Sequence, residues 1–140
     1  MLILDTNHLT ELERPNTERA SNLVQRLISS PTDSATTIIT VEEQLAGRIA
    51  QIRSQRLLHN QLVYYHRLND HVDFFAAWLV LPFDTEAADL VLNFRSKGIR
   101  IGTMDLKIAA ITMVHDATLL TRNTVDFAKV PGLKFENWLD

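Results

Sequence analysis

Four acidic residues stand where an α/β protein gathers the polar groups of a site. Asp5 directly follows the apolar run 2–4, which predicts a strand that is buried on both faces and ends in a carboxylate. The carboxyl ends of parallel strands and the starts of the next helices meet at one rim of a sheet. The other three acids also follow predicted strands or begin a predicted helix. The candidate cluster is Asp5, Glu43, Asp105 and Asp126.

Carboxylates that meet at one rim suit a hard divalent cation. Mg²⁺ and Mn²⁺ prefer oxygen ligands in near-octahedral geometry. Such an ion can activate water and stabilise charge during an in-line displacement at phosphorus. Without a cation the packed carboxylates would repel, and at least one would be pushed toward protonation. The pattern therefore predicts a divalent-metal site with chemistry suited to in-line displacement at phosphorus.

Each acid also has a purely structural interpretation. Asp5 is a good helix-cap residue, and Asp105 would be a favourable charge at a helix N-terminus. Glu43 fits a capping box in which Thr40 caps the helix and the glutamate reaches back to it. Asp126 fits a turn. Taken singly, these structural roles are the commoner ones, but four acids gathering at one rim by chance is a rarer outcome.

Short apolar strands alternate with helices along the chain. We expect strands at 2–4, 34–40, 80–83, 117–121 and 133–135, the third at an edge because it contains Pro82. We expect helices at 7–13, 17–28, 40–54, 58–79, 84–97 and 103–114. Pro15 should end the first helix and a break near Gln55 should separate the middle two, while Asp84 and Thr103 should cap the last two. This alternation predicts a single domain over residues 1–140, a three-layer α/β/α sandwich with a mostly parallel central sheet.

The composition narrows the class of protein. The chain has 140 residues and no cysteine, which excludes disulfides and thiolate metal sites and fits a reducing compartment. The net charge of −3 argues against a protein that coats nucleic acid, although acids gathered around a cation would leave the remaining surface nearly neutral. The longest apolar run, 74–83, is half of the roughly 20 residues that a membrane helix needs. We therefore expect a cytoplasmic protein with no membrane partner.

Four sequence blocks occur in the order of a known family. They are 4–7 (LDTN), 40–43 (TVEE) with Gly47 four residues on, 101–110 (IGTMDLKIAA) and 120–127 (LTRNTVDF). The tail 130–138 extends the likeness. Together the blocks resemble the PIN-domain nucleases, and more closely the VapC toxins of bacterial toxin–antitoxin pairs.

This resemblance implies a PIN-like fold and a Mg²⁺- or Mn²⁺-dependent endoribonuclease. Its substrate would be RNA used in translation, tRNA or rRNA, and a cognate antitoxin would inhibit the enzyme. By the same resemblance, Asp5 and Asp105 are the principal metal ligands, and Glu43 and Asp126 complete the catalytic, metal-binding pocket. The small polar residues expected to support that pocket are Thr6, Thr121 and Asn123.

The site glutamate has a neighbour that competes for the role. Glu42 and Glu43 stand side by side, and a helical wheel puts Glu42 nearer the apolar face. The spacing of four to Gly47 favours Glu43, which we take as the site residue.

Other residues have a less specific pattern. His8 is close enough to Asp5 in sequence to tune the site. Arg48, Arg53 and Arg56 form a basic stripe that either grips phosphates or is a solvated helix face. The apolar face of 58–79 is predicted to be mostly core, with part of it meeting the second subunit of a homodimer or the antitoxin.

Two rival functions remain open at this point. An aspartyl-phosphate phosphatase also places Asp after its first strand, but it needs a second Asp where this chain has Asn7. A non-catalytic PIN-like interaction module would keep the fold and bind only a partner protein. The presence of all four acids disfavours that second rival.

Overall fold

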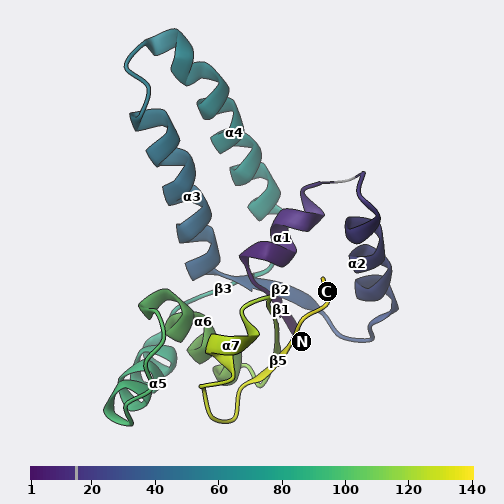
Figure 1. Cartoon of the computed structure of the whole chain (residues 1–140), viewed down its shortest axis with the longest axis vertical. Coiled ribbons are helices and arrows are strands. Elements are labelled where there is room, and N and C mark those ends of the chain that lie inside the picture. The colour runs from purple at the N-terminus through teal and green to yellow at the C-terminus, as the bar shows by residue number, and fades with distance from the viewer. Residues whose placement is uncertain (15) are drawn as a thin grey trace.

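A parallel five-stranded sheet lies at the centre of the molecule (Figure 1). The structure is a computed structural model that describes residues 1–14 and 16–140. The strand order is β3-β2-β1-β4-β5, and all four pairings are parallel. The strands are β1 (Leu2–Leu4), β2 (Ser34–Thr37), β3 (Val80–Leu81), β4 (Thr118–Leu120) and β5 (Lys134–Glu136). β3 is an edge strand, as predicted, and Pro82 follows it directly.

The order of the strands determines where a site is expected. From β1 the chain moves outward to β2 and β3 on one side, and then crosses to β4 and β5 on the other. The topology therefore reverses between β1 and β4, which is the point where open parallel sheets form their binding crevices. Leu4 pairs with Leu120, so Asp5 and Thr121 emerge side by side from the two strand ends.

Helices cover both faces of the sheet. The helices are α1 (Thr6–Leu12), α2 (Glu18–Ser29), α3 (Ile38–Arg53), α4 (Leu58–Ala76), α5 (Thr85–Ser96), α6 (Thr103–Val114) and α7 (Thr124–Phe127). In β1, Ile3 packs into the core formed with α5, α6 and α7, whereas Leu2 and Leu4 pack into the core formed with α1 and the end of α4. The prediction of a three-layer sandwich with a first strand buried on both faces is thus confirmed.

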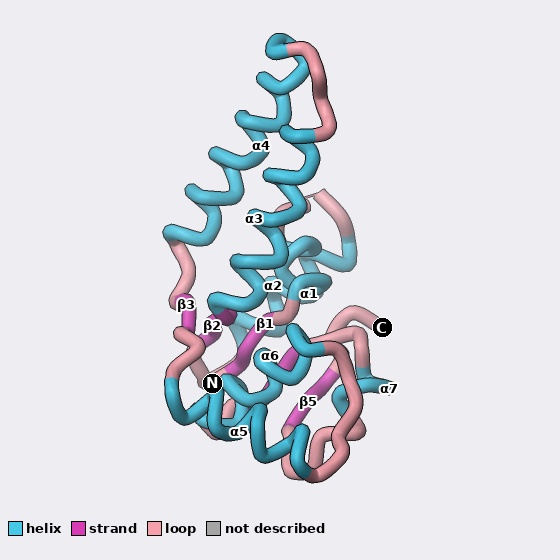
Figure 2. Tube along the Cα trace, turned by 90° about the vertical axis from the view of Figure 1, so that its left-hand side faces the viewer, coloured by secondary structure: helices cyan, strands magenta, loops and turns pink. Residues whose placement is uncertain are grey.

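The helices α3 and α4 form an antiparallel arm that projects well beyond the sheet (Figures 1 and 2). The break between them falls at 54–57, as predicted. The prediction that the apolar face of 58–79 is mostly core was wrong, because the outer part of the arm has only its partner helix to pack against. In α4 only His71 and Phe75 are buried, while Leu58 is 77% exposed and Leu62 62%.

Two of the predicted helix caps were wrong. β2 ends at Thr37 rather than Thr40, and the Thr37 side chain caps α3 by accepting a hydrogen bond from the Thr40 backbone N–H at 3.2 Å. Thr40 therefore lies inside the helix, and the capping box with Glu43 does not form. Thr103 is the first residue of α6 and not its cap, since that position is held by Gly102.

Other local predictions had mixed outcomes. Asp84 caps α5 as predicted, accepting from the Ala87 N–H at 2.9 Å. Asp126 lies in the one-turn helix α7 and not in a turn. Pro15, expected to end the first helix, lies outside the described residues. No helix in the described part of the chain is both long and apolar enough to cross a membrane.

Candidate active site

The carboxylate of Asp5 is fixed at the end of β1 by two hydrogen bonds. Its Oδ1 accepts from the Thr6 backbone N–H at 2.7 Å, and its Oδ2 accepts from Thr121 Oγ1 at 3.1 Å. Thr121 is buried and its Oγ1 also accepts from the Asn123 backbone N–H at 3.0 Å. The ends of β1 and β4 are thereby tied together, and Thr6 supports Asp5 through its backbone.

The amide of Asn123 holds two further acids together. Its Nδ2 donates to Asp105 Oδ2 and to Asp126 Oδ2, each at 3.1 Å. These carboxylates come from the first turn of α6 and from α7, so Asn123 joins both helices to the loop after β4. Lys129 Nζ lies 3.3 Å from Asp126 Oδ1 and balances its charge.

Three of the four acids have raised pKa values. Burial raises the pKa of Asp5 despite its hydrogen bonds. Loss of solvation raises the pKa of Asp105, and the charges of Asp5 and Asp126 raise it further. Loss of solvation likewise raises the pKa of Glu43, with added repulsion from Asp5 and Asp105. Asp126 is the exception, because hydrogen bonds from Asn123 and Lys129 hold its pKa below the usual range.

These effects place Asp5, Glu43 and Asp105 near one another at the switch point of the sheet, and Asn123 holds Asp126 beside Asp105. Asp5 directly follows β1, Glu43 lies in α3 and Asp105 in the first turn of α6, as the sequence pattern predicted. Asp126 lies in α7. Carboxylates that repel one another in their ionised forms are stabilised when a cation neutralises their charge. A positive charge beside these acids would therefore stabilise their ionised forms.

The donor set fits a hard divalent ion, since every candidate ligand is a carboxylate oxygen. Within residues 1–14 and 16–140, however, no three His, Cys, Asp or Glu side chains already stand in metal-ligand geometry. Asp105 and Asp126 each direct one oxygen to Asn123. The four-acid metal site stays a prediction.

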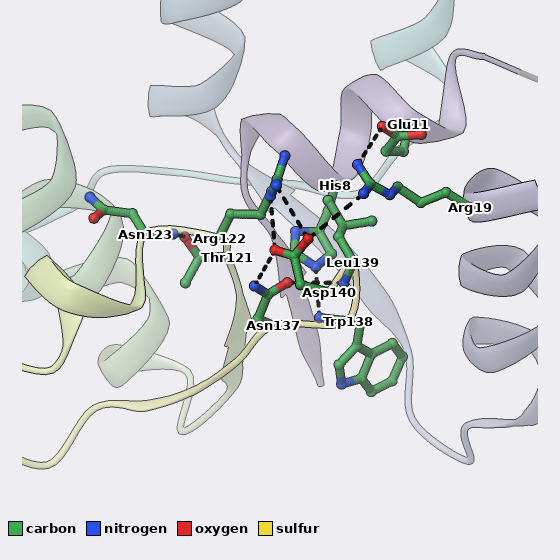
Figure 3. Close-up of polar contacts among 10 residues, drawn as sticks. All are labelled: His8, Glu11, Arg19, Thr121, Arg122, Asn123, Asn137, Trp138, Leu139 and Asp140. Carbon is green, nitrogen blue, oxygen red and sulfur yellow. Dashed lines mark hydrogen bonds and ion pairs between the residues drawn. The ribbon is translucent and has the colours of Figure 1, made fainter. Parts of the chain in front are cut away.

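His8 has a different role from the one predicted. Its side chain is fully buried, and its Nε2 accepts a hydrogen bond from the Trp138 backbone N–H at 3.2 Å (Figure 3). Burial lowers the pKa of His8 to about 4, with a further contribution from the positive charge of Arg122. The neutral imidazole therefore anchors the C-terminal residues and forms no hydrogen bond to Asp5 within the described part of the chain.

Residues 137–140 form a C-terminal strap. This strap also holds the loop that carries Thr121 and Asn123. Arg122 donates from Nε and Nη2 to the two carboxylate oxygens of Asp140, at 3.1 and 3.2 Å (Figure 3). Asn137 donates to the same carboxylate at 2.8 Å, and Arg19 of α2 lies 3.7 Å from it. Arg122 lies between Thr121 and Asn123, so the strap helps to fix both. Sequence reasoning missed this contact because no local pattern joins positions 122 and 140.

The amino-acid sequence matches a known protein family and a known relative over nearly its whole length. Residues 2–133 match the PIN domain family. The VapC ribonuclease Y4jK of Sinorhizobium fredii is 31% identical, over 98% of this chain and 96% of that protein.

Solved structures give the same result for the fold. FitAcB from Neisseria gonorrhoeae has a TM-score of 0.70 at 28% identity, covering 99% of this chain and 98% of the other. A toxin-antitoxin complex from Klebsiella pneumoniae contains a chain with a TM-score of 0.67 at 24% identity, covering 95% of both chains. From the match over nearly its whole length, the chain belongs to the PIN-domain family, in the group of the VapC proteins.

Proposed function

We propose that this chain is a metal-dependent endoribonuclease, the toxin of a toxin–antitoxin pair, that cleaves tRNA or rRNA in the cytoplasm. The observation that carries the proposal is the convergence of Asp5, Glu43 and Asp105 at the switch point of the sheet, where loss of solvation raises the pKa of all three and the charge of Asp5 raises those of Glu43 and Asp105 further. The VapC ribonucleases that this chain resembles support the choice of RNA as substrate.

The acids and their supports have distinct roles in this proposal. Asp5 and Asp105 are the principal ligands of Mg²⁺ or Mn²⁺, and Glu43 and Asp126 complete the pocket. A bound divalent cation supplies the positive charge that stabilises the phosphorane-like transition state and lowers the pKa of water. Thr121 orients the Asp5 carboxylate, and Asn123 holds Asp105 against the repulsion of Asp126.

We also propose that the apolar surface of the α3–α4 arm is a protein-binding surface for an antitoxin. Leu58, Leu62 and Tyr65 are each more than half exposed, and exposed apolar groups gathered on one helix mark sites of protein contact. The structural similarity to a chain of a toxin-antitoxin complex fits this assignment.

Cleavage of RNA by the purified chain is expected to depend on a divalent cation. Total tRNA and rRNA should give discrete fragments in Mg²⁺ or Mn²⁺, none in EDTA, and fragments again when the ion is restored in excess. Gel electrophoresis of end-labelled RNA measures this result. Cleavage that persists in EDTA would contradict the metal-dependent mechanism, and no cleavage under any condition would favour a non-catalytic interaction module.

Glu43, and not Glu42, is expected to be required for cleavage. Glu43→Gln removes a carboxylate that lies close enough to Asp5 and Asp105 for their charges to raise its pKa, and it should lower kcat/KM by about 10²-fold. Glu42→Gln should stay within about twofold of wild type. The two variants are matched controls, because both positions are exposed on the same turn of α3. The reverse order of effects would assign the site to Glu42.

A further inference from the structure

A cleft of about 310 Å³ runs along α3 away from the acid cluster. Its lining residues are Glu43, Gln44, Gly47, Arg48 and Gln51, which lie along one stripe of the helix. Glu43 belongs both to the acid cluster and to this cleft, so the two are continuous. A Cβ atom added at Gly47 would meet nothing within 4 Å, which shows that the cleft is open at its middle.

Arg48 is a partly buried cation in this cleft, and none of the acids in the described part of the chain pairs with it. Its Nε donates to His71 Nδ1 and its Nη1 donates to Gln51 Oε1, both at 3.1 Å. Both N–H groups on Nη2 have no hydrogen-bond partner among the described residues, and none of the ion pairs there involves Arg48. A guanidinium that has lost part of its hydration and keeps unused donors is suited to bind an anion.

His71 and Glu13 fix the direction of that guanidinium. His71 is 3% exposed, and its Nε2 lies 3.0 Å from Glu13 Oε2 at the end of α1. Because an arginine only donates, His71 Nδ1 must be the acceptor of the Arg48 bond. The proton of the neutral ring is therefore on Nε2, which donates to Glu13. This chain of contacts joins α1, α4 and α3.

We propose that Arg48 is a substrate-binding residue that holds an RNA backbone phosphate adjacent to the one being cleaved, and that His71 and Glu13 are its positioning residues. The proposal rests on the proposed function, since the acid cluster at one end of the cleft is taken to hold the reacting phosphate. The two N–H groups on Nη2 can donate charge-assisted hydrogen bonds to phosphate oxygens, while the bonds to His71 and Gln51 hold the guanidinium in place. It also provides positive charge beside a pocket that would otherwise repel RNA. Arg53 and Arg56 are exposed and do not line the cleft.

The first test compares Arg48→Gln with Arg53→Gln, which removes the same charge from the same helix outside the cleft. With Mg²⁺ present and a single-stranded RNA oligonucleotide as substrate, Arg48→Gln should raise KM about tenfold or more and leave kcat within about twofold. Its slope of log KM against log salt should become shallower by about 0.7, the value for one lost phosphate contact. Arg53→Gln should leave KM and the slope near wild type.

The second test concerns the positioning residues. His71→Leu removes the acceptor of the Arg48 bond and should raise KM, whereas His71→Asn keeps an acceptor oxygen and should restore most of the binding. The double variant Arg48→Gln/His71→Leu should have the KM of Arg48→Gln alone, because His71 acts through Arg48. Thermal unfolding of each variant reports any loss of stability separately from KM.

The outcomes separate this inference from the proposed function. A wild-type chain that does not cleave RNA contradicts the proposed function itself. A wild-type chain that cleaves, with an unchanged KM in Arg48→Gln or an equal rise in Arg53→Gln, overturns only the role of Arg48. If His71→Leu unfolds at lower temperature with an unchanged KM, the histidine is a structural tie between helices and its positioning role is refuted. Loss of antitoxin binding in Arg48→Gln with normal KM would assign the residue to a protein interface instead.

Discussion

Asp105→Asn is expected to abolish RNA cleavage and, in the absence of metal, to raise the melting temperature of the protein. The carboxylate is a proposed metal ligand, and loss of its share of transition-state stabilisation should lower kcat/KM by about 10³-fold or more. The melting temperature should rise because the negative charge of Asp105 is disfavoured in the folded state by burial and by Asp5 and Asp126. The side-chain oxygen of Asn can still accept from Asn123. Asp5→Asn should have the same two effects, since burial raises the pKa of Asp5 as well.

Asp116→Asn is the matched control for these variants. Asp116 is exposed and pairs with Lys134 at 2.8 Å, which lowers its pKa. Its replacement should leave kcat/KM unchanged and should not raise the melting temperature. Single-turnover cleavage and calorimetry measure the two effects. Full activity in either Asp5→Asn or Asp105→Asn, with Mg²⁺ present, would refute the assignment of the site.

Acidification is expected to destabilise the protein through His8. Its pKa is lowered from 6.5 to about 4 in the folded state, so the unfolded chain binds the proton more readily. The contribution of the neutral His8 to the stability of the fold is therefore fully present above pH 6.5 and is lost as the pH falls from 6.5 to about 4. The loss amounts to about 3 kcal/mol at the acidic end of that window.

The acids of the cluster act in the opposite direction, so the effect of His8 must be measured as a difference. The raised pKa values of Asp5, Glu43 and Asp105 make the folded state gain stability as the pH falls toward their ordinary values. His8→Gln keeps an acceptor for the Trp138 N–H and leaves those acids unchanged. The difference in unfolding free energy between wild type and His8→Gln, from denaturant titrations between pH 4 and 7, should shrink on acidification. A difference that is constant with pH would show that His8 does not titrate in this way.

The parts of the fold that follow from local residue chemistry were predicted correctly from the sequence. The apolar run 2–4, with no alternation, predicted a strand buried on both faces, and Asp84 is a strong cap before an apolar helix. The gathering of the acids followed from a general property of parallel sheets, that strand ends and helix starts share a rim. These features need no knowledge of distant contacts.

The wrong predictions depend on tertiary structure. Thr37 and Thr40 are equally good caps by type, and the choice was decided by where β2 leaves the sheet. Helical periodicity in α4 indicates an apolar face but does not tell whether this chain supplies the surface to cover it. The contact between Arg48 and His71 joins helices that no local pattern relates, as does the bond between Arg122 and Asp140.

The position of β1 between β2 and β4 has a consequence for biosynthesis. Asp5 leaves the ribosome first, but its partner Thr121 lies 116 positions later, and Asp126 later still. Long-range parallel pairing of this kind forms late, after the intervening chain is available. A nascent polypeptide therefore carries separate acids but no assembled centre until the segment with Thr121 and Asp126 has been translated. If the chain attacks RNA used in translation, this delay protects the ribosome that is making it.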